Sequence, residues 1–314
     1  EVHRGRSFEQ VVMGRPVFFV DDDAAADQTA EDTLGEIARA VGFKEVSFQY
    51  EPIAAAFHYE TTIHHEERVL VADIGGGTSD FSIVRLSPER ARAADRWPDV
   101  LASGGVHIGG TDFDKQLSLA GVMPLLGHRS QLKGGREMPA SIYFNLATWH
   151  TINFAYSRQV WADHQQLYLD AADPERIDRL LALIRKRAGH WLAHQVEHAK
   201  IALSAHDSAT LALERFAPDQ QVVVSRAEFD LATQGLVEKV EVTVADLLSE
   251  AGIAAGEIDT VFFTGGSSGI PLLRQRIAAL LPQVRVVEGD LFGSIGAGLA
   301  VDAARRYGAA AGAQ

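Results

Sequence analysis

The chain has 314 residues, 46% of them hydrophobic and 23% charged, as in an ordinary globular protein long enough for two lobes. Its net charge of −13 opposes broad contact with nucleic acid, and its Lys and Arg residues form no continuous basic stripe. Cysteine is absent, which excludes disulfides and thiolate metal sites and suits the cytoplasm. No apolar run reaches the roughly 18 residues of a membrane span, and the sequence does not open with a signal-peptide pattern. We therefore expect a soluble cytoplasmic protein whose partners include neither nucleic acid nor a membrane.

The first 68 residues predict strands alternating with helices, which is typical of an α/β protein with a largely parallel sheet. We expect a strand from Gln10 to Val20, then a helix that begins at the acidic run Asp21–Asp23 and stops at Gly42. A second strand is predicted at Glu45–Gln49. A second helix begins at Glu51–Pro52, because proline is well suited to a first helical turn.

A hairpin is predicted next, with one strand at Arg68–Asp73, a glycine turn and a second strand at Phe81–Leu86. A polar stretch, Ser87–Asp99, leads onward. Residues 121–173 carry weak signals, and their aromatic residues from Tyr143 to Trp161 form either local core or a partner surface.

Regular elements return in the second half of the chain. We expect two helices over Pro174–Ala205, then strands at Ala209–Leu213 and Gln221–Val224, and a long helix that begins with a capping box of Ser225 and Glu228. A strand at Thr260–Phe263 then leads through a glycine loop to a helix that begins at Ile270–Pro271. A short strand at Arg285–Val287 and a small-residue helix from Phe292 onward follow.

The most informative glycine turn is Asp73-Ile74-Gly75-Gly76-Gly77-Thr78-Ser79-Asp80. Three glycines let backbone N–H groups approach an anion, since no Cβ intervenes, and Thr78 adds a hydroxyl donor. Asp73 and Asp80 bracket the turn and suit a hydrated Mg²⁺, which prefers one or two carboxylates together with phosphate and water. The alternative is a tight hairpin with two solvated aspartates.

Two further glycine turns follow apolar segments. Gly265, Gly266 and Ser267 precede a helix, which suits an anion or a ribose, although an ordinary strand-to-helix turn has the same form. The segment Ile108–Asp114 also begins a helix, and its aspartates are alternatively simple favourable charges at the helix N-terminus.

The order of these motifs resembles the actin-like ATPase superfamily, most closely the DnaK-type heat-shock chaperones (heat shock protein 70). The resemblance covers most of the chain except about residues 120 to 185. It rests on five segments: Glu51–Ala56, Val71–Val84, Ile108–Asp114, Phe263–Pro271 and Asp290–Ala300. The sequences of three other segments resemble those of the YegD-like branch, which lacks a peptide-binding domain. These segments are Met13–Pro16, Gln49–Pro52 and Met123–Leu126.

The resemblance implies that ATP or ADP and Mg²⁺ bind in a cleft between two lobes. The implied phosphate side comprises Gly75, Gly76, Gly77 and Thr78, with Asp73 and Asp80 orienting Mg²⁺ through water and Glu51 near the attacking water. Asp73, Thr78 and Glu51 would be catalytic. The implied adenosine side comprises Glu197, Lys200 and Ser204, with Gly265, Gly266 and Ser267 opposite them and Asp290 nearby.

Two departures from the family pattern matter. The family holds adenine between two arginines, but the matching positions here are Ile201 and Gly269. A guanidinium stack is worth on the order of 1 kcal/mol, so nucleotide affinity is expected to be lower and base preference looser. The family's first phosphate loop and catalytic lysine precede the region where this sequence starts. We therefore expect a piece of a longer protein, inactive by itself, whose full-length parent hydrolyses ATP slowly.

The resemblance also implies a domain plan for an actin-like (ribonuclease H-like) α/β fold without the N-terminal part of its first lobe. Residues 1–68 would be the remaining half of lobe I, and residues 69–110 and 226–307 the core of lobe II. Residues 111–225 would form an inserted cap, and residues 308–314 a flexible tail. Protein clients or co-chaperones would be partners besides nucleotide.

Two other functions stay open from the sequence. The first is a non-catalytic actin-fold scaffold, which the loss of the two arginines favours. The second is a zinc protease of the H-x-x-E-H kind, because His194 and His198 are one helical turn apart and Glu197 is placed as a general base.

Overall fold

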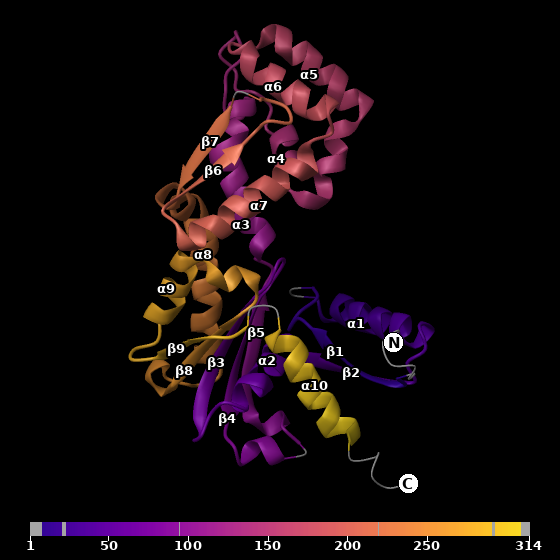
Figure 1. Ribbon diagram of the computed structural model, residues 1–314, viewed down its shortest axis with the longest axis vertical. Coiled ribbons are helices and arrows are strands. Elements are labelled where there is room, and N and C mark those ends of the chain that lie inside the picture. Colours follow the sequence, from indigo (N-terminus) through magenta and orange to yellow (C-terminus); the bar gives the residue numbers. More distant parts are fainter. Residues whose placement is uncertain (1–7, 21–22, 94, 219, 291–292, 309–314) are drawn as a thin grey trace. The chain divides into compact units, whose positions relative to one another are not determined.

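The computed structural model describes residues 8–20, 23–93, 95–218, 220–290 and 293–308 (Figure 1). The chain forms two compact units. Unit 1 comprises Glu1–Gly109, Lys239–Ser268 and Leu273–Gln314, and unit 2 comprises Gly110–Glu238 and Gly269–Leu272. No helix in the described ranges is both long enough and apolar enough to cross a bilayer. The lobe assignments stay a prediction, and the expected tail lies outside the described residues from 309 onward.

Unit 1 contains a mixed five-stranded sheet in the order β5-β4-β3-β8-β9. Its strands are β3 (Glu67–Ile74), β4 (Ser79–Leu86), β5 (Val100–Val106), β8 (Thr260–Thr264) and β9 (Arg285–Glu288). β4 pairs antiparallel with both β3 and β5, whereas β8 pairs parallel with both β3 and β9. The expected hairpin is therefore confirmed, and it occupies the centre of the sheet.

A second, two-stranded parallel sheet in unit 1 joins β1 (Gln10–Arg15) to β2 (Glu45–Tyr50), with α1 (Ala24–Ala40) between them in the chain. The strand predicted from Gln10 to Val20 was too long. It ends at Arg15, which still pairs with Tyr50 in the ladder, because the next residue, Pro16, has no N–H to donate. The buried Arg15 side chain pairs with Asp27 (2.7 Å) and Glu31 of α1. Asp23 caps α1 by accepting from Ala26 N (2.9 Å), while Asp21 and Asp22 lie outside the described residues.

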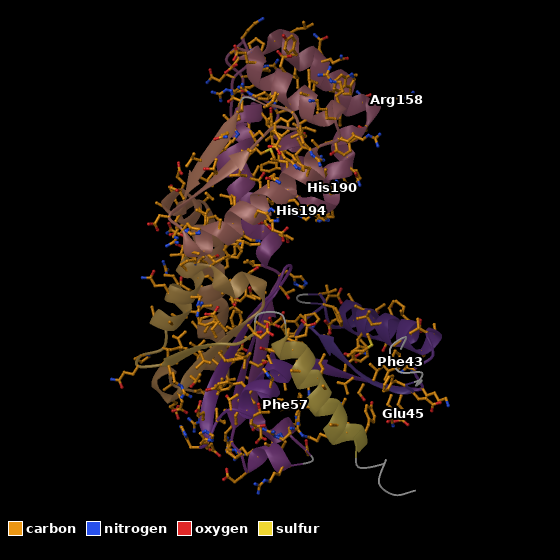
Figure 2. All side chains as sticks on the ribbon, in the orientation of Figure 1. Phe43, Glu45, Phe57, Arg158, His190 and His194 are labelled. Atoms are coloured by element: carbon orange, nitrogen blue, oxygen red, sulfur yellow. The ribbon has the colours of Figure 1, made fainter. Side chains whose placement is uncertain are left out.

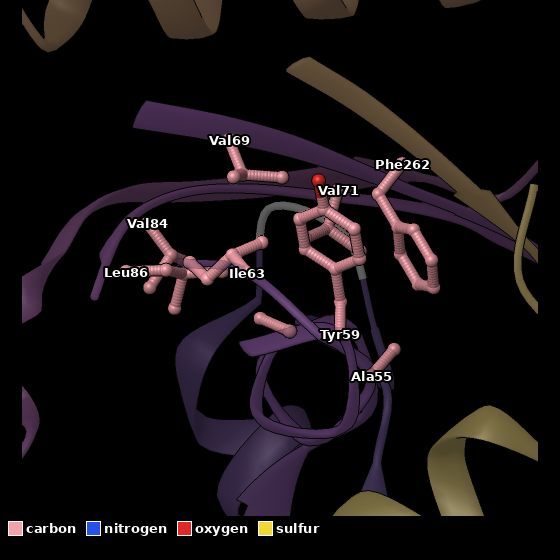
Figure 3. Packing of buried hydrophobic residues seen from close by; sticks show 9 residues of the cluster. Ala55, Tyr59, Ile63, Val69, Val71, Val84, Leu86 and Phe262 are labelled. Carbon is pink, nitrogen blue, oxygen red and sulfur yellow. The ribbon is translucent and has the colours of Figure 1, made fainter. Parts of the chain in front are cut away.

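Helix α2 (Glu51–Glu60) packs on the five-stranded sheet and brings its apolar residues into the core of unit 1. Figure 3 shows Tyr59 and Ile63 against the sheet side chains, and the Tyr59 ring stacks on Phe262 with 4.8 Å between centroids. The buried members of this cluster are Ala55, Ala56, Tyr59, Ile63, Val69, Val71, Val84, Leu86 and Phe262. Burying each large apolar side chain contributes about 1.5–3 kcal/mol.

Helix α10 (Ser294–Tyr307) packs closely on α2. The contact depends on Gly298, because a Cβ there would overlap the backbone carbonyl of Ala54. The predicted small-residue helix thus comes close to its neighbour at Gly298. At Gly296 a Cβ would meet nothing within 4 Å, so that glycine is not needed for packing. The predicted start of the helix at Phe292 lies outside the described residues.

The polar stretch Ser87–Asp99 is held by a buried ion network. Arg96 donates to both carboxylate oxygens of Glu60 (2.6 and 2.7 Å) and to Asp99 (2.6 Å). Arg90 donates to the other oxygen of Asp99. The network therefore joins the end of α2 to the connection that precedes β5.

In the described part of the chain, unit 2 contains five whole α-helices, the first half of a sixth and one hairpin. Its elements are α3 (Gly110–Leu117), α4 (Ser141–Ala147), α5 (Arg158–Asp170), α6 (Pro174–Arg185), α7 (Gly189–Ala205), β6 (Ser208–Ala212), β7 (Gln221–Ser225) and the first half of α8 (Arg226–Glu250). The two helices predicted over Pro174–Ala205 are confirmed. The capping box is confirmed too, since Glu228 N donates to Ser225 Oγ (3.2 Å) and Ser225 N to Glu228 Oε2 (2.8 Å). The short helix α9 (Pro271–Ala279) then leads to β9.

The weakly patterned segment 121–173 contains α4 and α5 together with several short turns. A π-helical turn (Ser118–Val122) and a 3₁₀ turn (Met123–Leu126) precede α4, and another 3₁₀ segment (Trp149–Tyr156) follows it. Its aromatic residues have mixed roles. Tyr143 is fully buried, whereas Phe154 is 64% exposed, so the segment supplies both core and surface.

Candidate functional site

The triple-glycine turn connects β3 to β4 in unit 1. Asp73 and Asp80 lie opposite each other in the ladder, just before and just after the turn. Gly75 N donates to Thr78 O (2.9 Å), so this amide closes the turn. A Cβ at Gly76 or Gly77 would meet nothing within 4 Å. The turn therefore offers open space beside Gly76 and Gly77.

The second glycine turn lies beside the first because β3 and β8 are parallel neighbours, with Asp73 opposite Thr264. Ser267 Oγ donates to Gly75 O (2.9 Å). Gly265 has φ +81°, and a Cβ there would lie 2.5 Å from Ile74 O and 2.6 Å from Asp73 Oδ1. Only glycine satisfies both the left-handed backbone and this close approach.

The third glycine turn, in the segment Ile108–Asp114, also lies beside the triple-glycine turn. Ser79 Oγ donates to Ile108 O (2.7 Å), and a Cβ on Gly109 would lie 2.5 Å from Gly77 N. The turns after β3, β5 and β8 thus meet at one edge of the sheet. Gly109 was not among the predicted site residues, although the Ile108–Asp114 motif pointed to its segment.

Asp80 is held on two sides. Thr78 Oγ1 donates to its Oδ2 (2.6 Å), and Val17 N, which follows β1 in the chain, donates to its Oδ1 (2.7 Å). A Cβ on Gly105 would lie 2.9 Å from Asp80 Oδ1, so a small residue is needed there as well. These contacts give Thr78 and Asp80 a clear positioning role in the turn.

Asp73 has a different environment. It is 4% exposed, and no residue in the described ranges donates a hydrogen bond to its carboxylate. Burial raises the pKa of Asp73 to about 8, and the charges of Glu51 and Asp80 add to the rise. The pKa of Glu51, the first residue of α2, is raised too, by burial and then by Asp80. The charges of Glu51 and Asp80 therefore oppose ionisation of Asp73, and the charge of Asp80 opposes that of Glu51. A cation relieves this opposition.

This arrangement fits a hydrated magnesium ion better than a directly bound one. Among the residues that the structure describes, no three His, Cys, Asp or Glu side chains come close enough to hold one ion directly. Mg²⁺ commonly keeps several waters and uses one or two carboxylates. The same finding leaves the zinc-protease alternative without support, because His194, Glu197 and His198 form no such group in the described part of the chain.

The predicted adenosine residues of helix α7 lie in unit 2. Lys200 is buried, and its ammonium donates to Gly110 O (3.1 Å) and Asp114 Oδ2 (2.9 Å). Burial raises the pKa of Asp114, and Lys200 opposes that rise. Lys200 therefore holds the beginning of α3, a contact 86 residues distant that no local pattern encodes.

The other predicted adenosine residues of α7, Glu197 and Ser204, are less buried than Lys200. Glu197 lies 3.3 Å from His194 Nδ1 and lines a pocket of about 350 Å³ with Trp149 and Asp114. A Cβ on Gly269 would be 3.8 Å from Ser204 Oγ, so these two are neighbours in unit 2. Ile201 is 58% exposed.

Asp290 is exposed in unit 1, at the junction between β9 and α10. Its backbone carbonyl accepts from Ser294 Oγ (2.8 Å), and Gly293 leaves room for its carboxylate. Gly289 N, just before it, donates to Phe263 O (3.0 Å), which fixes this junction beside the end of β8.

A mixed sheet with glycine turns and buried carboxylates meeting at one edge defines unit 1 as an α/β structure. The sequence profile of the family described as Hsp70 protein matches residues 1–120 and 175–306, so the chain belongs to the Hsp70 family. The nucleotide-binding domain of that family has the actin-like ATPase fold.

Similar curated proteins are chaperones by name. The chain is 26% identical over 308 residues to the chaperone protein DnaK of Mycoplasmoides gallisepticum, covering 95% of this chain and 42% of that protein. It is 29% identical to a chaperone protein HscA homolog of Shewanella amazonensis (95% and 38%) and 27% identical to the chaperone protein dnaK of Guillardia theta (93% and 38%). The chain thus spans about two fifths of the length of these relatives.

Proposed function

We propose that unit 1 binds the phosphates of ATP or ADP with Mg²⁺, and that the intact protein is a chaperone that hydrolyses ATP slowly. The observation that carries this is the buried Asp73 carboxyl, which lacks a hydrogen-bond donor in the described part of the chain and adjoins Glu51, Asp80 and the open side of the glycine turn. Magnesium bound there would supply positive charge to the phosphates. Asp73 would hold its water shell, and the amides of Gly76 and Gly77 would orient phosphate oxygens.

In this proposal the catalytic group comprises Asp73, Thr78 and Glu51. Glu51 would position the attacking water. Thr78 has one hydroxyl proton, which it donates to Asp80 Oδ2, and this proton would turn to a phosphate oxygen when nucleotide binds. The adenosine roles of Glu197, Lys200, Ser204 and of Gly265 to Ser267, with Asp290, remain part of the proposal. So do a YegD-like branch, a cytoplasmic location, and clients or co-chaperones as partners.

Calorimetric titration of Mg·ADP into the purified chain tests the phosphate site. We expect Asp73→Asn to weaken Mg·ADP binding about tenfold or more, because it removes a carboxylate from the ion's water shell. The matched control is Asp178→Asn, an exposed aspartate on α6, which should leave affinity unchanged. Equal affinity for wild type and Asp73→Asn would show that the turn does not bind the nucleotide's phosphates.

Turnover needs a separate assay in the full-length parent. There Asp73→Ala is expected to lower the rate of ATP hydrolysis by at least about a hundredfold, the scale on which lost transition-state charge stabilisation acts. If the parent binds Mg·ATP but wild type and variant both fail to turn over, the protein is a nucleotide-binding scaffold and the hydrolysis part of the proposal is wrong.

A further inference from the structure

Three arginines gather at one end of unit 2 without an ion-pair partner among the described residues. Arg158 is the first residue of α5, and Arg185 and Arg187 lie at the end of α6 and just beyond it. All three side chains are exposed, and Figure 2 labels Arg158 where α5 begins. We call these arginines, together with Tyr156 and Trp161, the arginine patch.

Two adjoining pockets make this surface concave. One, of about 430 Å³, is lined by every member of the patch. The second, of about 550 Å³, shares Tyr156 and Arg187 with the first and continues to Phe154. No acidic side chain of the described residues lines either pocket, although the chain has 42 Asp and Glu against 29 Lys and Arg. The patch is therefore a positive island on an acidic protein.

Arg187 occupies a backbone position that favours glycine. Its φ is +49°, in the left-handed region, directly after the C-cap residue of α6. Arg187 N donates to Ile184 O (3.0 Å) and Ala188 N to Leu183 O (3.1 Å), which ends the helix in the usual left-handed manner. Arginine is an unfavourable choice for such a turn, so its side chain needs a reason of its own.

The reason is visible in what the Arg187 side chain contacts. Its guanidinium lies over the Tyr156 ring, 5.7 Å from the centroid. The ring itself is fixed, because Tyr156 Oη accepts from Gly189 N (2.8 Å). A guanidinium held over an aromatic ring keeps its N–H donors, which lie in the plane of the guanidinium group itself, available to an incoming anion.

We propose that the arginine patch binds an acidic segment of a partner protein. Guanidinium groups bind carboxylates in pairs of parallel hydrogen bonds, and Arg and aromatic residues are the side chains that most often dominate protein interfaces. Trp161 and the 64% exposed Phe154 give apolar surface for an aromatic or aliphatic side chain of the segment. Two pockets in series suit an extended peptide with carboxylates on either side of such a residue.

Arginine with aromatic residues is also a combination that binds single-stranded nucleic acid. The net charge of −13 disfavours that ligand here, because a long polyanion would be repelled beyond the patch and three arginines neutralise few phosphates. A short acidic segment carries less charge and needs only local complementarity. The patch therefore favours a peptide.

No residue of the arginine patch is among the residues of the proposed nucleotide site. Tyr156, Arg158 and Trp161 lie in residues 121–174, which the Hsp70 profile does not match. An acidic partner bound there would be particular to chains that carry this segment, and its binding can be measured without nucleotide.

Fluorescence anisotropy tests the proposal with a fluorescein-labelled 12-residue peptide of Glu and Asp with two Phe. The variant is Arg158→Ser with Arg187→Gly, in which glycine removes a guanidinium and also relieves the left-handed backbone. The matched control is Arg129→Gly, because Arg129 is also exposed and has φ +61°, outside the patch. We expect wild type to bind the peptide, the double variant to bind about tenfold more weakly, and the control to bind within about twofold of wild type.

Three results would overturn the proposal. The first is no binding of the acidic peptide by wild type, and the second is an equal loss in Arg129→Gly. The third is tighter binding of a labelled 12-nucleotide oligo-dT than of the peptide, which would assign the patch to single-stranded nucleic acid. A peptide with Lys in place of Glu and Asp serves as the ligand control and is expected not to bind. Weaker binding of the acidic peptide at higher salt supports the charge pairing.

Discussion

At the residue scale, Asp73 is a buried carboxyl group that lies beside two glycine turns and has a raised pKa. The parallel pairing of β3 with β8 and the antiparallel pairing with β4 bring two glycine turns to it. Its raised pKa means that, without a cation, the folded protein holds a proton there at neutral pH. A bound cation favours the ionised carboxylate, so binding of magnesium and loss of that proton are coupled.

That proton gives a dependence of stability on pH. The pKa of Asp73 is 3.8 in the unfolded chain and about 8 when folded, so between these values the folded state binds more protons. The free energy of unfolding therefore falls as pH rises from about 4 to about 8. Asp73→Asn cannot ionise, so its free energy of unfolding does not fall in this way. In EDTA, we expect the variant to be more stable than wild type by on the order of a few kcal/mol at pH 8.5. The difference should be smaller at pH 5.

Thermal unfolding of both proteins from pH 5 to pH 9 checks the sign. The difference in Tm between Asp73→Asn and wild type should widen as pH rises. Asp178→Asn gives the baseline for removing an exposed carboxylate. A constant difference in Tm across the range would mean that Asp73 ionises normally in the folded protein.

The glycines of the site differ in what they contribute. Gly265→Ala would place a methyl group 2.5 Å from Ile74 O on a left-handed backbone, and we expect a loss of stability of about 2 kcal/mol or more. Gly76→Ala meets open space, so stability should change by less than about 0.5 kcal/mol. The same Gly76 methyl occupies room that the proposed phosphate needs, so Mg·ADP affinity should fall without loss of stability. Urea unfolding and calorimetry together separate these effects, and a normal nucleotide affinity in Gly76→Ala would place the phosphate elsewhere.

At the element scale, the contact between α2 and α10 gives a paired prediction. Gly298→Ala forces a methyl group against the Ala54 carbonyl and should cost about 2 kcal/mol or more, because the two helices must separate. Gly296→Ala, half a turn away on the same helix, has no neighbour within 4 Å and should stabilise by up to about 1 kcal/mol through helix propensity. Urea unfolding measures both changes. Equal effects at the two positions would contradict the close packing at Gly298.

Elements with strong local signals were predicted well. The capping box of Ser225 and Glu228 and the hairpin around the triple glycine were both visible in the sequence. Strand β5 was missed because its middle, Ser103-Gly104-Gly105, lacks the β-branched and aromatic pattern of a strand. The reason for those glycines is tertiary, since a Cβ on Gly104 would press on Leu247 and one on Gly105 on Asp80.

The candidate site was predicted as a set of residues, not as a set of contacts. Glycine turns after strands gave the positions of Gly75 to Gly77 and of Gly265. The bond from Val17 N to Asp80 joins residues 63 apart, and the Lys200 contact to Asp114 joins residues 86 apart. Such pairings depend on how strands and helices assemble, and a local pattern carries no information about them.

At the scale of the whole molecule, each unit has its own buried core. Unit 1 has the cluster around Tyr59 and Phe262, and unit 2 buries Phe113, Tyr143 and Leu180. The chain passes between the units at 109/110, 238/239, 268/269 and 272/273. Separate cores allow each unit to open without the other, even though unit 2 is inserted within the sequence of unit 1.

Hydrogen exchange on two variants tests this independence. Gly298→Ala destabilises unit 1, whereas Gly127→Ala destabilises unit 2, since Gly127 has φ +104° and its Cβ would lie 2.8 Å from Tyr143 Oη. A loss of about 2 kcal/mol makes exchange through opening roughly thirtyfold faster. We expect Gly298→Ala to accelerate exchange in β3 and β4 but not in α4 and α6, and Gly127→Ala to do the reverse. If either variant accelerated protected amides of both units equally, the molecule would open as one cooperative body, because a local loss of stability would then be shared by every buried hydrogen bond.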